Sequence, residues 1–147
     1  MVKLTHFIQW PVPSSRNLDK PKFTICINHS HELNDSLNEW AQSGLIKNKP
    51  VSIKYLEYDT HQLSSCNILY IANNKKLSFL LNQAKKYHIL TISDISGNAK
   101  RGVLINFFKE KEKLRFEINL DAAQESGFII SPRILKLATI VNNKEME

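Results

Sequence analysis

The sequence has 147 residues, a formal net charge of +6, 42% hydrophobic residues and 23% charged residues. A chain of this length is typical of one domain, which we assign to residues 1–147, and its composition excludes collagen-like, low-complexity and wholly disordered classes. No apolar stretch approaches the roughly 20 residues that cross a bilayer, so we expect no membrane insertion.

The positive charge comes mainly from lysine. Four of the 20 basic residues are Arg and the remaining 16 are Lys. Nucleic-acid recognition usually relies on the bidentate Arg side chain, whereas scattered Lys more often forms a solvated surface. The charge favours anionic partners at long range without selecting one. We expect no nucleic-acid binding.

The first two thirds of the chain alternate between short apolar runs and helical stripes. Continuous or β-branched apolar runs predict buried strands, and apolar side chains at three- and four-residue spacing predict helices. In chain order these patterns predict the end of a helix over 1–10, a strand over 23–27, a helix from His31 to Gly44, a strand over 51–56, a connection with a helical turn over 57–65, a strand over 66–72, a helix over 75–86, a strand over 89–93 and a polar loop over 94–102.

The pattern changes after residue 102. Two apolar runs, 103–109 and 114–120, flank a short charged segment and predict an antiparallel hairpin. Asp121 is the expected cap of a helix over 122–126, and Ser131 is the expected cap of a last helix. The side chains expected on the buried face of that last helix are Ile134, Leu135, Leu137, Ala138 and Val141.

This order of elements predicts the fold class. Strands that alternate with helices are typical of a parallel sheet covered by helices, and a hairpin adds antiparallel strands. We therefore expect an α/β fold, with a mostly parallel sheet of about four strands flanked by helices and a C-terminal antiparallel hairpin.

A catalytic or metal-binding pattern is missing from the sequence. It contains no H-E-x-x-H, G-x-S-x-G, G-x-G-x-x-G or P-loop motif. His29, His31 and Glu32 could converge at a strand-to-helix turn and hold a metal, but a solvated helix cap is the favoured interpretation of these residues. We therefore expect no bound metal, no cofactor and no enzymatic activity.

The carboxyl ends of the predicted strands are the best place for a ligand, because parallel sheets bind ligands along this rim. The candidate ligand-binding residues are Asn28, His29, Ser93 and Asp94 on the rim, with Arg101, Arg115 and Arg133 near later motifs. The favoured interpretation of Asp94 is a loop acid that accepts hydrogen bonds from turn amides. A nucleotide or another anion is the expected ligand class.

Apolar side chains near the C-terminus are candidates for an interaction surface. Phe107 and Phe108 point to opposite faces of the predicted hairpin, so one of them is exposed unless a partner or a helix covers it. We take Phe108, Phe128 and Ile129 as the candidate interaction residues.

Several segments carry a recognisable family pattern. They are FIQWP at 7–11, the predicted strands at 23–27 and 66–71, LTISD at 90–94 followed by Gly97, RGVLINF at 101–107, LRFEINLDAA at 114–123, Gly127, Ile130–Ser131 and ILKLA at 134–138. In order and spacing these segments resemble the YfiR-like family of periplasmic regulators. The resemblance covers nearly the whole chain and is most specific in the C-terminal half.

The resemblance implies a periplasmic protein that forms homodimers and is not an enzyme. It implies a partner, a membrane-bound diguanylate cyclase or sensor kinase. The expected role is to bind and restrain the cyclase, so that release raises cyclic di-GMP and promotes biofilm. Selective binding to one conformation of the partner would be sufficient for such restraint. The alternative hypothesis is a small-ligand sensor domain that binds a nucleotide or anion and feeds a histidine kinase.

The same resemblance implies a disulfide between Cys26 and Cys66, because the matching cysteines are bridged in a relative. An oxidising compartment favours such a bridge. Cys26 lies late in its strand and Cys66 early, so ideal parallel register would hold them too far apart. We expect either a local bend that permits the bridge or two free buried thiols. No leader is visible at the start of the sequence, so we also expect a mature or trimmed N-terminus.

Overall fold

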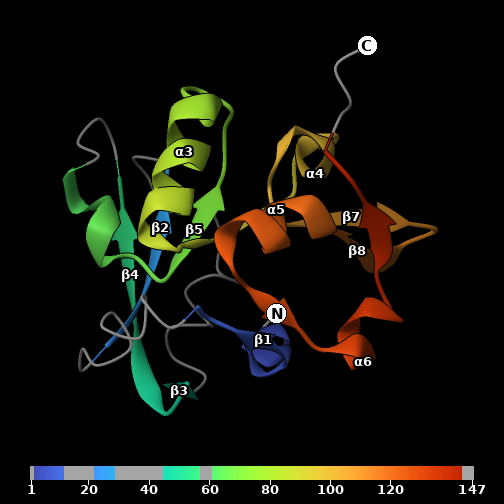
Figure 1. Ribbon diagram of the computed structural model, residues 1–147, viewed down its shortest axis with the longest axis horizontal. Coiled ribbons are helices and arrows are strands. Elements are labelled where there is room, and N and C mark those ends of the chain that lie inside the picture. The colour runs from blue at the N-terminus through green and yellow to red at the C-terminus, as the bar shows by residue number, and fades with distance from the viewer. Residues whose placement is uncertain (1, 12–21, 29–44, 57–60, 144–147) are drawn as a thin grey trace.

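The computed structural model describes residues 2–11, 22–28, 45–56 and 61–143 (Figure 1). The helices are η1 (Val2–Phe7) and η3 (His61–Ser65), which are 3₁₀ helices, and α3 (Leu77–Tyr87), α4 (Asn98–Arg101), α5 (Leu120–Ser126) and α6 (Pro132–Leu135). The strands are β1 (Ile8–Gln9), β2 (Phe23–Ile27), β3 (Leu45–Ile46), β4 (Lys49–Tyr55), β5 (Ile68–Ile71), β6 (Leu90–Ser93), β7 (Ile105–Glu110), β8 (Lys113–Asn119), β9 (Ile129–Ile130) and β10 (Thr139–Val141). The predicted helix from His31 to Gly44 lies outside the described residues.

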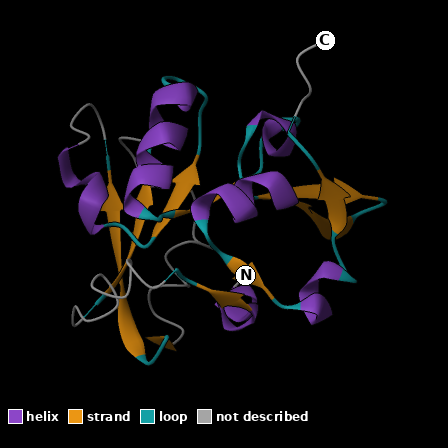
Figure 2. Cartoon of the chain, viewed as in Figure 1, coloured by secondary structure: helices purple, strands orange, loops and turns teal. Residues whose placement is uncertain are grey.

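A curled, eight-stranded sheet forms the centre of the described structure (Figure 2). Its strand order is β10-β8-β7-β6-β5-β2-β4-β3. The five strands from β4 to β7 in this order are parallel to one another, and β8 returns antiparallel beside β7 as the predicted hairpin. The predicted mixed α/β class is therefore confirmed in outline, but the estimate of about four strands plus a hairpin was too low.

Strand β2 is buried along its whole length because it lies in the middle of the parallel strands. Phe23, Ile25 and Ile27 belong to one hydrophobic cluster, and Cys26 belongs to a second cluster on the opposite face. Alternate side chains of a strand point to opposite faces, so β2 joins the two clusters. Helix α3 supplies buried side chains to the second cluster, including Leu80.

The N-terminal segment is joined to the C-terminal part by a two-stranded antiparallel sheet. Ile8 of β1 pairs with Ile130 of β9, and the Ser131 N–H donates a hydrogen bond of 2.8 Å to the Phe7 carbonyl. The expected helix over 1–10 is therefore wrong in its second part. Residues 8 and 9 pair as a strand instead, and the helical residues before them form a single 3₁₀ segment.

Trp10 fastens this N-terminal segment to the core. Its ring lies edge-on to Phe23 and to Phe128, with ring centroids 5.6 and 5.7 Å apart. The indole N–H donates to the Asn67 carbonyl at 3.3 Å. A buried Trp needs such an acceptor, and the edge-on geometry suits the charge distribution of aromatic rings.

Two corrections concern the starts of the later helices. Helix α5 is capped by Asn119, whose side-chain oxygen accepts a hydrogen bond of 2.9 Å from Ala122 N–H. Asp121, the expected cap, lies in the first turn and accepts from the Asn143 N–H at 2.9 Å. The predicted loop over 94–102 contains the short helix α4.

The last helix is shorter than predicted. Ser131 caps α6 as expected, but α6 ends at Leu135, and residues 139–141 form β10 parallel to β8. Ile134 and Val141 are buried, whereas Leu137 is 75% exposed. The expectation that Leu137 lies on a buried helix face is therefore wrong.

Candidate functional site

The carboxyl ends of β2 and β5 lie where the strand order reverses, which is a common ligand site in open α/β sheets. Asn28 occupies this point. Its Nδ2 donates to the Asn73 carbonyl at 2.8 Å, its Oδ1 accepts from Ala72 N–H, and its own carbonyl accepts from Asn73 Nδ2 at 2.7 Å. These bonds tie the end of β2 to the loop after β5, so Asn28 closes the rim instead of presenting a free amide.

Ser93 is used by the fold in the same way. Its buried Oγ donates to the Ile71 carbonyl at 2.8 Å and accepts from Ile95 N–H at 3.3 Å and from Asn98 Nδ2 at 3.0 Å. Asn98 also forms a reciprocal amide pair with Asn74, with bonds of 2.9 and 3.0 Å. A hydroxyl has one donor and two acceptor positions, so the Ser93 side chain is fully satisfied.

Asp94 is exposed at the end of β6 and interacts with Tyr70 of the neighbouring strand β5. Burial, and then the negative charge and hydrogen bond of Asp94, raise the pKa of the Tyr70 hydroxyl above its ordinary value. A Tyr hydroxyl is already protonated near neutral pH, and the raised pKa extends this hydrogen-bond-donating form of Tyr70 to higher pH. His29, the fourth predicted rim residue, lies outside the described residues.

The three candidate arginines do not converge. Arg101 lies at the end of α4, and its side chain donates to Asn98 Oδ1 at 3.2 Å. Arg115 lies on β8 and pairs with Glu110 at 3.4 Å across the hairpin. Arg133 lies on α6 beside a different hollow. The structure therefore gives no single anion site built from all three.

The candidate interaction residues also have three different environments. Phe128 is only 5% exposed and packs against Trp10, so its expected place on the surface is wrong. Phe108 is half-buried on β7, and its neighbour Phe107 is buried against Phe116. Ile129 is 62% exposed on the short strand β9.

A different surface gathers apolar side chains from three elements. A hollow of about 310 Å³ lies between η1, β8 and α6. Its lining residues, which we call the apolar face, are Leu4, Phe7, Phe116, Arg133, Ile134 and Leu137. Arg133 is the only charged member. Leu137 is exposed, Ile134 is buried and the other apolar members are half-buried. Grouped apolar side chains that stay accessible mark interaction sites more often than scattered ones do.

Two further apolar side chains extend the exposed surface near the apolar face. Leu114 is 63% exposed, and it lies on the same side of β8 as Phe116 because the two are separated by two positions. Ile140 is 44% exposed on β10, at the end of the sheet. In the sequence, the β-branched run at 139–141 favours a strand. In the structure this run forms β10, and helix α6 ends at Leu135, before Leu137.

Cys26 and Cys66 form a disulfide, with Cα atoms 5.8 Å apart. Cys66 precedes β5, in a segment held against β2 by two hydrogen bonds. Asn67 N–H donates to the Thr24 carbonyl at 2.9 Å, and Thr24 N–H donates to Asn67 Oδ1 at 2.9 Å. The chain bends at Asn67, just before β5. The bend brings Cys66 close to Cys26, although ideal parallel register would hold the two cysteines too far apart for a bridge. Both cysteines are fully buried, so the bridge is part of the core.

Within residues 2–11, 22–28, 45–56 and 61–143, no three His, Cys, Asp or Glu side chains are grouped closely enough to hold a metal ion. In the same part of the chain, no helix is long and apolar enough to cross a membrane.

A family model described as YfiR/HmsC-like matches residues 1–139. None of the curated proteins compared with the chain matches it significantly. Among solved structures, the ABC domain from Streptococcus pneumonia in complex with L-Trp is similar, with a TM-score of 0.64 and 13% identity. The match covers 95% of this chain and 59% of that chain, and at this identity it shows the fold alone.

Proposed function

The chain belongs to the YfiR/HmsC-like family, and on that premise we propose that it binds and restrains a membrane-bound diguanylate cyclase from the periplasmic side. The family is one of periplasmic regulators of cyclic di-GMP signalling rather than of enzymes. In this proposal the protein contributes binding energy and no covalent chemistry. Release of the restraint raises cyclic di-GMP and promotes biofilm.

The observation that carries the proposal is the apolar face. Leu137 projects into solvent beside Phe7 and Phe116, and Arg133 is the one charge among them. A protein surface with this composition suits a partner that presents apolar side chains around one carboxylate, because the carboxylate would pair with Arg133 while the rest is removed from water. The occupant we assign to the apolar face is the periplasmic sensor domain of the cyclase.

Restraint follows from differential affinity. If the protein binds the inactive conformation of the sensor domain 100-fold more tightly than the active one, the equilibrium shifts by about 2.7 kcal/mol. A partner that is mostly active alone then becomes mostly inactive at saturation. Equal affinity for both conformations would give no restraint, however tight the complex.

The disulfide supports the periplasmic location within this proposal. Disulfides persist in oxidising compartments, and the Cys26–Cys66 bridge links two central parts of the core. We also propose that the protein is a homodimer, as its family resemblance implies. Sedimentation velocity at micromolar concentration should then give about twice the monomer mass of 17.0 kDa, and a monomer at all concentrations would contradict this part.

The experiment is affinity purification from detergent-solubilised membranes of the source cells. Wild-type protein should retain a diguanylate cyclase, identified by mass spectrometry. Leu137→Asp should reduce its recovery at least tenfold, because it places a carboxylate in the apolar contact. Gln124→Asp is the matched control, since it adds the same charge at an exposed position on α5 outside the apolar face. Equal recovery with Leu137→Asp, or no cyclase with the wild type, would contradict the proposal.

The second candidate function, a small-ligand sensor domain, is favoured by one observation. Arg101 lines a hollow that is separate from the apolar face and rich in cationic side chains. A ligand present at 100 times its dissociation constant should raise stability by about 2.7 kcal/mol in a thermal-shift assay. A flat response to nucleotides and other anions would remove this candidate.

A further inference from the structure

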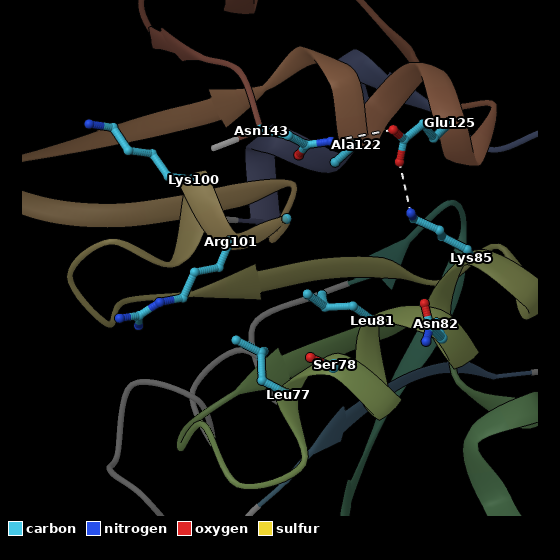
Figure 3. A pocket seen from close by; sticks show the side chains of 11 residues that line it. Leu77, Ser78, Leu81, Asn82, Lys85, Lys100, Arg101, Ala122, Glu125 and Asn143 are labelled. Carbon is cyan, nitrogen blue, oxygen red and sulfur yellow. Dashed lines mark hydrogen bonds and ion pairs between the residues drawn. The ribbon is translucent and has the colours of Figure 1, made fainter. Parts of the chain in front are cut away.

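A second hollow, of about 420 Å³, lies between helices α3, α4 and α5 (Figure 3). This volume is within the range of small-molecule sites, roughly 300–1,000 Å³. The hollow shares no lining residue with the apolar face. It therefore needs its own explanation, independent of the proposed cyclase contact. We call it the α3–α5 groove.

One part of the α3–α5 groove is apolar. Leu77 and Leu81, from successive turns of α3, line it and are half-buried. Gly102 lines the groove beside them, with a left-handed φ of 118°. A Cβ at this position would come 3.2 Å from Leu81 Cδ1, so glycine leaves space next to the leucine. The groove thus offers an aliphatic surface to an apolar group.

The polar part of the α3–α5 groove has an excess of positive charge. Glu125 is its one carboxylate, and that carboxylate is already bound by Lys85 Nζ at 2.8 Å and Asn143 Nδ2 at 3.3 Å. Lys100 and Arg101 are also in the lining, and within the described part of the chain neither forms an ion pair. Figure 3 shows the Lys85–Glu125–Asn143 contacts on one side and the Arg101 side chain on another.

We propose that the α3–α5 groove binds a small organic anion, in which a carboxylate, sulfonate or phosphate group is joined to an apolar body. The anionic group pairs with Arg101, which uses one of its five N–H donors on Asn98 and keeps the others available. Lys100, whose side chain points in a different direction from that of Arg101 in Figure 3, adds further positive charge to the lining. The apolar body lies on Leu77 and Leu81. Glu125 stays neutralised by Lys85 and does not repel the ligand.

This assignment differs from the ligand site expected on the sequence. That expectation joined Arg101 to the strand-end rim and to two other arginines. In the structure the rim amides and hydroxyl are satisfied internally. Arg101 donates to Asn98 beside the rim and also lines the groove between the helices. The site therefore depends on helix packing between α3 and α5, which sequence motifs do not reveal.

The probe for the test is 8-anilinonaphthalene-1-sulfonate, which joins a sulfonate to an aromatic body and fluoresces when bound. N-phenyl-1-naphthylamine is the matched probe without the charge. Two double variants are compared. The groove pair carries Lys100→Ala and Arg101→Ala together, and the control pair carries Lys113→Ala and Arg115→Ala together. Both pairs remove two exposed cations, but the control pair lies on the hairpin, outside the groove.

The expected result has three parts. The sulfonate probe binds wild-type protein, and the groove pair weakens its affinity at least tenfold, while the control pair changes it less than twofold. The uncharged probe binds wild type at least tenfold more weakly than the sulfonate. Amide chemical-shift changes in a ¹H–¹⁵N spectrum centre on Leu77, Leu81 and Gly102.

A steric variant provides a second measurement. Ser78→Trp places a large ring in the groove from an exposed position on α3, and circular dichroism should show that the fold is retained. It should exclude the probe. The proposal is overturned if the groove pair and wild type bind equally, if the probe does not bind up to millimolar concentration, or if the shifts centre on Leu137 of the apolar face. None of these results depends on the cyclase, so failure here leaves the proposed function to its own test.

Discussion

Reduction of the Cys26–Cys66 bridge should lower the free energy of unfolding by about 4 kcal/mol. The bridge joins residues 40 positions apart in the sequence. Closing a loop of this length removes about 13 cal/mol/K of entropy from the unfolded chain, which is about 4 kcal/mol at 25 °C. With an unfolding entropy of roughly 300 cal/mol/K for a chain of this size, the melting temperature should fall by roughly 13 °C.

The assay compares one protein in two redox states, so that the packing atoms are the same. Urea unfolding is followed by tryptophan fluorescence and far-ultraviolet circular dichroism, for oxidised protein and for protein reduced in denaturant and refolded with a phosphine reductant. The control is the double variant Cys26→Ala with Cys66→Ala, whose midpoint should not respond to the reductant. Identical urea midpoints for oxidised and reduced wild type would refute the reasoning.

Three further predictions concern the polar rim and the N-terminal anchor, each measured by urea unfolding. Asn98→Ala should lower the free energy of unfolding by about 2–3 kcal/mol, because it leaves the polar partners of a buried amide unsatisfied, whereas Asn142→Ala at an exposed site should change it by less than about 0.5 kcal/mol; similar losses would contradict this. Trp10→Ala should lower the free energy of unfolding by about 3–5 kcal/mol and Trp10→Phe by clearly less, because Phe can keep part of the two aromatic contacts. Equal losses for the two variants would contradict this. The folded-state pKa of Tyr70 is raised above its ordinary value of 10.0, so the folded state holds this proton more tightly and stability should fall as the pH rises above 10. Tyr70→Phe should show a shallower fall, and equal slopes would contradict the cause assigned to the shift.

Local patterns were sufficient for the central strands and the hairpin. The runs that became β2, β5 and β6 are apolar on both faces, and burial in the middle of a parallel sheet is what such runs favour. Charged residues at 110–113 between two apolar runs led directly to the β7–β8 hairpin. In these segments, the tertiary environment agrees with the local preference.

The errors lie where a short element is decided by its neighbours. Helix α4 has four residues between two glycines in left-handed conformation, too short to carry an apolar stripe. Asn119 is the last residue of β8, within the predicted strand, and its side chain also caps α5, a role that was expected of Asp121 from the sequence. Strand β10 forms because β8 offers it an open edge, and the helix before it stops early enough to expose Leu137.

The candidate site could be predicted only in part, because contacts with distant residues also decide which of its polar atoms are free. Asn28 and Asp94 directly follow β2 and β6, and Ser93 ends β6, as the sequence indicated. Whether their polar atoms are free depends on residues far away in the sequence. Asn28 bonds to a residue 45 positions later, and Ser93 bonds to a carbonyl 22 positions earlier. The disulfide was anticipated through family resemblance, while the bend that permits it depends on Asn67.

If the apolar face restrains a diguanylate cyclase, as we propose, the protein should lower the rate of cyclic di-GMP synthesis. The cyclase, purified in detergent with its periplasmic domain, is supplied with GTP and titrated with this protein. Wild type and Gln124→Asp should lower the rate saturably, and Leu137→Asp should need at least tenfold higher concentration for the same effect. A synthesis rate that stays constant at saturating wild-type protein would rule out restraint by this protein.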